Sequence, residues 1–216
     1  MTALLWLTRD LRLHDHPALA AALEEHDRVV PVFCLDQRLL DGRHASAPRT
    51  RFMLECLADL DRGLRARGSA LVVRHGAPER VLPALAREVG ASAVHCSADS
   101  GPFARRRANG LRAALESAGV RLAAHPGLHA IDDLAGVTTA AGRPYTVFSP
   151  FHRAWERMPR RAVVPAPAEL HPLPAALDTG TVPSGGPALD MRGAPRGGEE
   201  VARSRAFEFL ADGVRR

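Results

Sequence analysis

Short apolar runs alternate with amphipathic segments along the first 125 residues. The apolar runs are typical of buried strands, and they cover residues 3–8, 28–35, 70–74, 92–96 and 120–124. Between them, apolar residues recur at helical spacing, over residues 17–25, 50–67, 78–89 and 103–118. Strands that alternate with helices predict right-handed crossovers and a parallel sheet that is covered on both faces.

Proline and glycine support the predicted helix boundaries. Pro17 and Pro78 begin two helical segments, and Gly68, Gly90 and Gly119 follow three helix ends. The fold class is therefore α/β, a Rossmann-like doubly wound sheet of five parallel strands. Such sheets bind ligands outside the carboxyl ends of their strands, which directs attention to residues 8–12, 36–51, 75–76 and 97–103.

The pattern changes after the first domain, which we place at residues 1–130. Residues 131–198 read as a connector and a proline- and glycine-rich linker, and we expect Phe148, Phe151 and Trp155 to pack the connector onto the sheet. Residues 199–216 begin with one more amphipathic helix. Its apolar residues either fold back on the sheet or belong to a second domain that the chain barely enters.

Composition is that of a soluble globular protein, with 46% hydrophobic and 25% charged residues. All 29 basic residues are arginine, against 24 acidic residues, which gives a net charge of +5. Coding bias explains the total number of arginines. Single arginines at strand ends, however, suit planar contacts to phosphate groups or aromatic rings. Three cysteines without metal-type spacing indicate a reducing compartment, the cytoplasm. The sequence shows neither an export signal nor a run of apolar residues that is long enough for a membrane span.

Several enzyme classes lack their signatures in this sequence. It contains no GxGxxG after the first strand, no phosphate-loop motif, no GxSxG, no HExxH and no CxxC pair. The ten histidines show no metal-ligand spacing along the chain. The residues alone therefore predict a ligand-binding α/β domain, without a catalytic residue or a metal ligand that we can assign.

One stretch of the sequence is more specific than these general patterns. WLTRDLRLHDHPAL, residues 6–19, resembles the signature of the DNA photolyase and cryptochrome family. The resemblance continues through VFCLD at 32–36, residues 47–82, DSGPFARRR at 99–107 and YTVFSPFHRAW at 145–155. It covers about residues 3–157 in the order and spacing of the family, and EEVARSRAFEFL resembles the first helix of the family's cofactor domain.

The resemblance implies the light-harvesting domain of a deoxyribodipyrimidine photolyase, a flavoprotein lyase that repairs pyrimidine dimers in DNA with blue or near-UV light. In that family the N-terminal domain carries an antenna chromophore, and a helical C-terminal domain holds FAD and binds DNA. The 216-residue chain matches only the first part. We therefore expect no catalysis and at most weak DNA binding from this piece, which we expect to be a monomer.

The DSGPF segment resembles the deazaflavin-using members, so 8-hydroxy-5-deazaflavin is the favoured antenna, with flavin mononucleotide or a reduced folate as alternatives. The expected antenna site consists of residues near strand ends: Arg9, Asp10, Phe33, Cys34, Leu35, Arg49, Phe52, Asp99, Pro102 and Phe103.

Some of these antenna-site candidates have an alternative, purely structural interpretation. Arg9 and Asp10 could form an ion pair, Phe33 could be core, and Asp99 could cap the next helix. At the level of the whole protein, the alternatives are a cryptochrome-like photoreceptor fragment and a stand-alone domain that binds a small molecule or nucleotide.

Overall fold

The computed structural model of the chain describes residues 1–42, 45–184 and 194–213. A five-stranded parallel sheet forms its centre, in the order β3-β2-β1-β4-β5. The strands are β1 (Thr2–Leu7), β2 (Arg28–Leu35), β3 (Val72–His75), β4 (Ala91–Ser97) and β5 (Arg121–His125). The prediction of a doubly wound α/β fold is confirmed, and each strand lies within two residues of its predicted bounds at either end.

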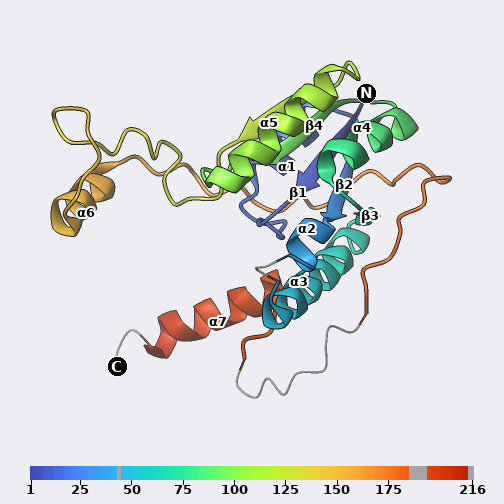
Figure 1. Cartoon of the computed structure of the whole chain (residues 1–216). Helices are drawn as coiled ribbons and strands as arrows, with labels where there is room; N and C mark the ends of the chain where they lie inside the picture. The colour runs from blue at the N-terminus through green and yellow to red at the C-terminus, as the bar shows by residue number, and fades with distance from the viewer. Residues whose placement is uncertain (43–44, 185–193, 214–216) are drawn as a thin grey trace.

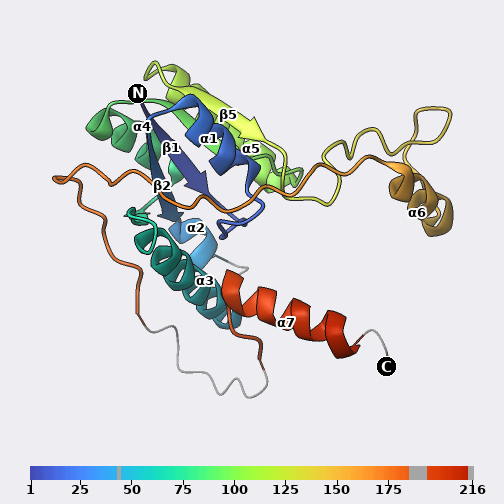
Figure 2. The ribbon, with the colours of Figure 1, turned by 180° about the vertical axis from the view of Figure 1, so that it is seen from behind.

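Helices cover both faces of the sheet (Figures 1 and 2). One apolar layer joins the sheet to α1 (Pro17–Glu25) and α3 (Ala47–Arg65), and the other joins it to α4 (Pro78–Val89) and α5 (Pro102–Glu116). Alternate residues of β1 serve the two layers: Leu5 and Leu7 face α1 and α3, whereas Leu4 and Trp6 face α4 and α5. A strand that is buried on both faces needs apolar residues at every position, which explains its unbroken apolar run.

Two short helices were not expected from the sequence. The single turn α2 (Gln37–Leu40) follows β2, and Asp36 begins it by accepting the Arg38 backbone N–H. Helix α6 (Phe148–Arg157) lies within the segment predicted as connector. We expected its rings to pack on the sheet, and this is wrong: α6 stands apart from the sheet, none of its residues is buried, and Phe148 is 72% exposed (Figure 1). Its aromatic rings contact one another instead.

The segment predicted as linker is irregular but packs on the domain over residues 159–184. It returns from α6 across the sheet to the β3 edge and then turns toward α7 (Glu199–Asp212) (Figures 1 and 2). The Thr179 carbonyl accepts the Val73 N–H of the edge strand at 2.7 Å. Gly180 follows with φ +64°, and a Cβ there would clash with the Val73 carbonyl. This segment therefore covers an edge that would otherwise expose unpaired backbone groups.

Helix α7 meets the rest of the protein mainly through its first turn. The backbone N–H of Glu199 donates to Asp59 of α3 at 2.7 Å, and the Glu199 carboxylate accepts the N–H groups of Leu13 and His14. The side chains of Phe207, Phe209 and Leu210 are 61–75% exposed and do not fold back on the sheet. The last residues of the predicted C-terminal segment, 214–216, and part of the predicted linker, 185–193, lie outside the described residues.

Candidate functional site

The strand order reverses between β1 and β4, so the ends of these two strands border the crevice where doubly wound sheets bind ligands. Thr8, Arg9 and Asp10 follow β1, while Ser97 and Asp99 lie at the end of β4 and just after it. Arg9 reaches across this point and pairs with Asp99 at 3.2 Å, with its own side chain 72% exposed. The ion pair that we considered between Arg9 and Asp10 is not formed, because Arg9 pairs with Asp99 instead.

Asp10 ties three elements together at the crevice. Its buried carboxylate accepts the Thr8 backbone N–H at 3.0 Å and the hydroxyl of Ser97, and His16 Nε2 lies 3.1 Å away. His16 Nδ1 accepts the Leu19 N–H at the start of α1, which leaves Nε2 as the ring nitrogen on the side of Asp10. Burial alone would raise the pKa of Asp10, yet the contacts with His16, Ser97 and Thr8 hold it well below its ordinary value.

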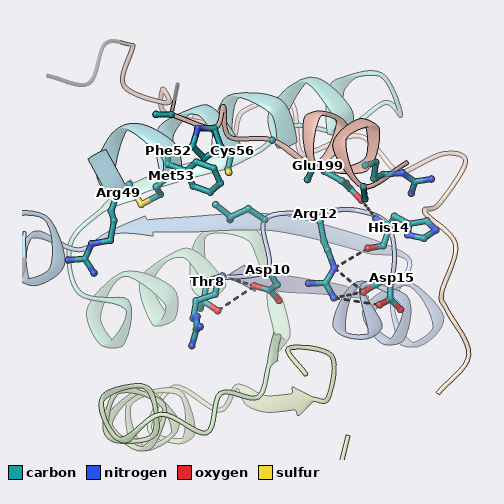
Figure 3. A pocket seen from close by; sticks show the side chains of 18 of the residues that line it. Thr8, Asp10, Arg12, His14, Asp15, Arg49, Phe52, Met53, Cys56 and Glu199 are labelled. Carbon is teal, nitrogen blue, oxygen red and sulfur yellow. Dashed lines mark hydrogen bonds and ion pairs between the residues drawn. The ribbon is translucent and has the colours of Figure 1, made fainter. Parts of the chain in front are cut away.

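A large hollow of about 920 Å³ opens beside the end of β1 (Figure 3). Phe52, Met53 and Cys56 of α3 form an apolar wall, and the loop after β1 forms the opposite wall. The first turns of α7 close a third side through residues that include Glu199 and Ala202. The rim carries arginines from three elements, namely Arg9, Arg49 and Arg203.

The loop after β1 is held in one shape by side-chain bonds. Arg12 donates to the carbonyls of His14, Asp15 and Gly127, with a shortest distance of 2.6 Å. Asp15 has a positive φ of 52°, and its carboxylate pairs with Arg161 at 2.7 Å. A wall fixed in this way presents its polar groups to the hollow at a small entropic cost on binding.

A second hollow of about 500 Å³ lies between α5 and the ends of β1 and β4. Trp6, Asp99, Pro102 and several arginines line it. The Arg107 guanidinium lies 4.9 Å from the Trp6 ring centre and 5.5 Å from that of Phe103. Thr8 borders both hollows, and the Arg9–Asp99 pair connects them.

The expected antenna residues, apart from Phe103, fall into three groups. Arg9, Asp10, Arg49 and Phe52 line the large hollow, and Asp99 and Pro102 line the smaller one. The third group is inside the sheet: Phe33, Cys34 and Leu35. Phe103 lines neither hollow; it lies beside Arg107 and is 45% exposed.

The residues of this third group belong to the core and line neither hollow. Phe33 and Leu35 face the layer of α1 and α3, and Cys34 faces α4 and α5. Burial raises the pKa of Cys34 to about 12, so its thiol stays protonated. Asp99 accepts the Gly101 N–H at 2.8 Å in the turn before α5, but it accepts no N–H of the helix itself, so the capping role that we considered for it is wrong.

Sequence reasoning missed Met53, Cys56, Glu199 and Arg203, which also line the large hollow. Positions 49, 52, 53 and 56 share one face of a helix, so the spacing from Arg49 and Phe52 could have found the first two. Nothing in the local sequence reveals Glu199 and Arg203, because their place depends on how α7 docks on α3.

This arrangement defines a class: a doubly wound α/β domain with hollows at and beside the switch between β1 and β4. The sequence model of the family described as DNA photolyase matches residues 3–174. The chain therefore belongs to the DNA photolyase family. No helix among the described residues is long and apolar enough to cross a membrane, and Cys34, Cys56 and Cys96 are free thiols.

Named relatives include both photolyases and cryptochromes. A deoxyribodipyrimidine photo-lyase of Halobacterium salinarum is 39% identical over 97% of this chain and 46% of its own length. A cryptochrome DASH of Gloeobacter violaceus is 36% identical over 97% of this chain and 44% of its own length. An uncharacterized 31.6 kDa protein of Synechococcus is 39% identical over 80% of this chain and 60% of its own. This chain spans about half the length of the two named relatives.

Solved structures agree with the fold. A Synechocystis cryptochrome superposes with a TM-score of 0.87 at 25% identity, over 99% of this chain and 47% of its own. An archaeal photolyase from Sulfolobus tokodaii gives a TM-score of 0.69 at 28% identity, over 80% of this chain and 39% of its own. The latter was described with two FAD molecules, implying a novel light-harvesting cofactor in that protein.

Proposed function

We propose that this chain is the light-harvesting part of a deoxyribodipyrimidine photolyase. In this proposal it binds an antenna chromophore in the crevice beside β1 and passes the excitation to an FAD that other residues of a longer protein hold. The observation that carries the proposal is the large hollow beside the end of β1, next to the switch point, with an apolar helix face on one side and arginines on its rim. Family membership supports the same conclusion.

The hollow fits a flat chromophore in size and chemistry. Its volume of about 920 Å³ falls in the usual range for small-molecule sites, roughly 300–1,000 Å³. Phe52 and Met53 offer an apolar surface for a ring system, and Arg9 and Arg49 offer planar donors for carbonyl or phosphate oxygens. Energy transfer depends on proximity and orientation, so it needs no acid, base or nucleophile from this chain.

The favoured antenna is 8-hydroxy-5-deazaflavin, with flavin mononucleotide and a reduced folate as alternatives. The DSGPF segment at 99–103 supports the deazaflavin, and the two-FAD archaeal relative supports a flavin. Because Phe33, Cys34 and Leu35 are core residues, we now assign ring contact to Phe52 and Met53. Arg9 and Asp99 would orient the chromophore from the boundary between the two hollows.

The test is a fluorescence and absorption titration of the purified chain with each of the three chromophores. We expect saturable binding of the deazaflavin, weakened about tenfold by Arg49→Ala through loss of a charge-assisted contact. Phe52→Ala should weaken it as well. Arg80→Ala, an exposed arginine on α4, is the matched control and should change nothing. Absence of binding by all three chromophores to the folded chain would refute the proposal.

A second candidate is a blue-light photoreceptor part, which the cryptochrome DASH relatives favour. This chain would bind a chromophore in a photolyase and in a photoreceptor alike. The two candidates would differ in whether the longer protein repairs DNA. We assign DNA binding mainly to that longer protein, with weak and salt-sensitive attraction from the net charge of +5 on this chain.

A further inference from the structure

Three histidines and a glutamate meet on the α1 face of the sheet, beside the edge strand β5. His95 comes from the middle of β4, His125 ends β5, and Glu25 and His26 lie at the last turn of α1. His26 Nε2 lies 3.2 Å from His95 Nε2, and Glu25 Oε2 lies 3.9 Å from both nitrogens. Figure 2 shows α1 lying across the sheet close to β5, which is what brings these residues together.

These separations match a metal site. Zn²⁺ binds imidazole nitrogen and carboxylate oxygen at about 2.0–2.2 Å in tetrahedral geometry, which puts neighbouring ligand atoms about 3.3 Å apart. The observed distances of 3.2, 3.9 and 3.9 Å need only small side-chain movements to reach that value. Two nitrogens and one carboxylate oxygen form a donor set that zinc accepts readily, with a fourth position left for water.

The two imidazole ligands are fixed by the packing around them. The side chains of His95 and His26 are only 0% and 5% exposed, so their rings are held in place beside Glu25.

His125 completes the arrangement as an orienting residue. Its Nε2 lies 3.0 Å from His95 Nδ1, and the two rings are stacked with centres 5.0 Å apart. When His95 Nδ1–H donates to His125, His95 Nε2 carries the lone pair that faces His26 and Glu25. Metal-binding histidines commonly have such a partner, which fixes both the tautomer and the ring orientation.

The charges around the cluster favour a cation overall. Arg121 donates to Glu25 Oε2 and opposes a metal there, but its side chain is 54% exposed and can turn toward solvent. A groove of about 500 Å³ borders Glu25 and His26 and gives access from the surface. Four acidic residues line this groove, namely Glu24, Glu25, Asp27 and Glu169. The N-terminal amine pairs with Asp27 and neutralises one of them.

The carbonyl end of α1 adds negative potential at the same place, because His26 caps the helix there. Nitrogen ligands disfavour Mg²⁺ and Ca²⁺, which prefer oxygen. The chemistry therefore selects a divalent transition metal.

We propose that Glu25, His26 and His95 form a Zn²⁺ site, oriented by His125, that joins the end of α1 to β4 at the β5 edge. The site lies on the α1 face of the sheet and uses none of the residues that line the two hollows described above. A metal at this position would stabilise the folded chain, since it would bind ligands that only the fold brings together.

The test uses the full chain without an affinity tag, first treated with a chelator. Zn²⁺ is titrated by calorimetry, and Co²⁺ serves as a spectroscopic probe because its visible absorption reports tetrahedral coordination. We expect one equivalent of each metal to bind, a tetrahedral Co²⁺ band, and a rise in the thermal unfolding midpoint with Zn²⁺. Binding of more than one equivalent without that band would show scattered surface binding and overturn the proposal.

Variants locate the site. Glu25→Gln is the safest change because this side chain is 44% exposed, and it should weaken Zn²⁺ binding markedly without unfolding the chain. His26→Gln should abolish the Co²⁺ band, and His125→Gln should weaken binding about tenfold through its orienting role. The matched control is His75→Gln, an exposed histidine at the opposite edge strand β3, which should leave binding unchanged. Equal binding by wild type and Glu25→Gln, or equal loss in His75→Gln, would refute the site.

Discussion

Asp10 shows how one buried residue can hold several elements of the site in place. Its partners come from the end of β1, the end of β4 and the start of α1. A buried carboxylate is stable only when hydrogen bonds replace its lost hydration. The sequence predicted Asp10 at a strand end near a ligand, but its partners Ser97 and His16 lie 87 and 6 positions away and could be found only from the fold.

The stability contributed by Asp10 should depend on pH in a defined direction. Its pKa is lowered in the folded state, so its contribution is complete above the unfolded value and is lost as pH falls below about 4. Asp10→Asn should lower the free energy of unfolding by about 3 kcal/mol at neutral pH, because it breaks a buried charged network. The difference in the free energy of unfolding between wild type and variant should become smaller in acid. Urea unfolding at a series of pH values measures this difference.

The control for this experiment is Asp212→Asn, an exposed aspartate at the end of α7. It should change the free energy of unfolding by less than about 0.5 kcal/mol at any pH. A gap for Asp10→Asn that stays constant into strong acid would contradict the assigned direction of the pKa.

At the level of elements, α7 is positioned mainly by its first turn and by the glycines that precede it. Asp59 of α3 accepts the first N–H groups of the helix, and Glu55 accepts the N–H of Gly197. Gly198 precedes the helix with φ +130°, and a Cβ on it would lie 2.9 Å from the Asp59 carboxyl carbon. The side of the large hollow that α7 forms therefore depends on a glycine.

Gly198→Ala should release α7 from α3. The backbone conformation favours glycine strongly, and forcing alanine into it costs about 1–3 kcal/mol. Trypsin cleavage after Arg203 or Arg205 should become about tenfold faster, since a cost of 1.4 kcal/mol changes an opening equilibrium tenfold. Mass spectrometry of timed digests gives the rate at each site.

Gly110→Ala provides the comparison, because a Cβ at this α5 position contacts nothing within 4 Å. It should leave cleavage of α7 unchanged. If Gly198→Ala were cleaved no faster than Gly110→Ala, the docking of α7 would not depend on this glycine.

The sheet and its flanking helices were predictable because their signals are local. Apolar runs, helical spacing and the prolines at helix starts identified the strands and the four helices that flank the sheet. The position of α6 was not predictable from its rings. Phe148, Phe151 and Trp155 are as apolar as core residues, yet Phe148 contacts Phe151 and Trp155 contacts His152, away from the sheet. A residue's hydrophobicity says that it needs a partner, and it does not say which one.

For the whole molecule, the segment 159–184 joins the two apolar layers. Leu170 packs on the layer of α1 and α3, whereas Leu177 packs on the layer of α4 and α5. The Leu170 N–H also donates to the Arg67 carbonyl at 2.7 Å. Its proline-rich sequence predicted only a linker, because irregular segments carry no periodic signal of burial. Burial here comes from single leucines that fit against a domain already formed.

Removal of these leucines should destabilise the domain in an additive manner. We expect Leu170→Ala and Leu177→Ala each to lower the free energy of unfolding by about 1–2 kcal/mol, since both side chains are partly buried. The double variant should lose the sum, because the two positions lie in opposite layers and share no partner. Leu210→Ala, 69% exposed on α7, is the control. A double variant as stable as the control would mean that the segment only rests on the surface and contributes nothing to the domain.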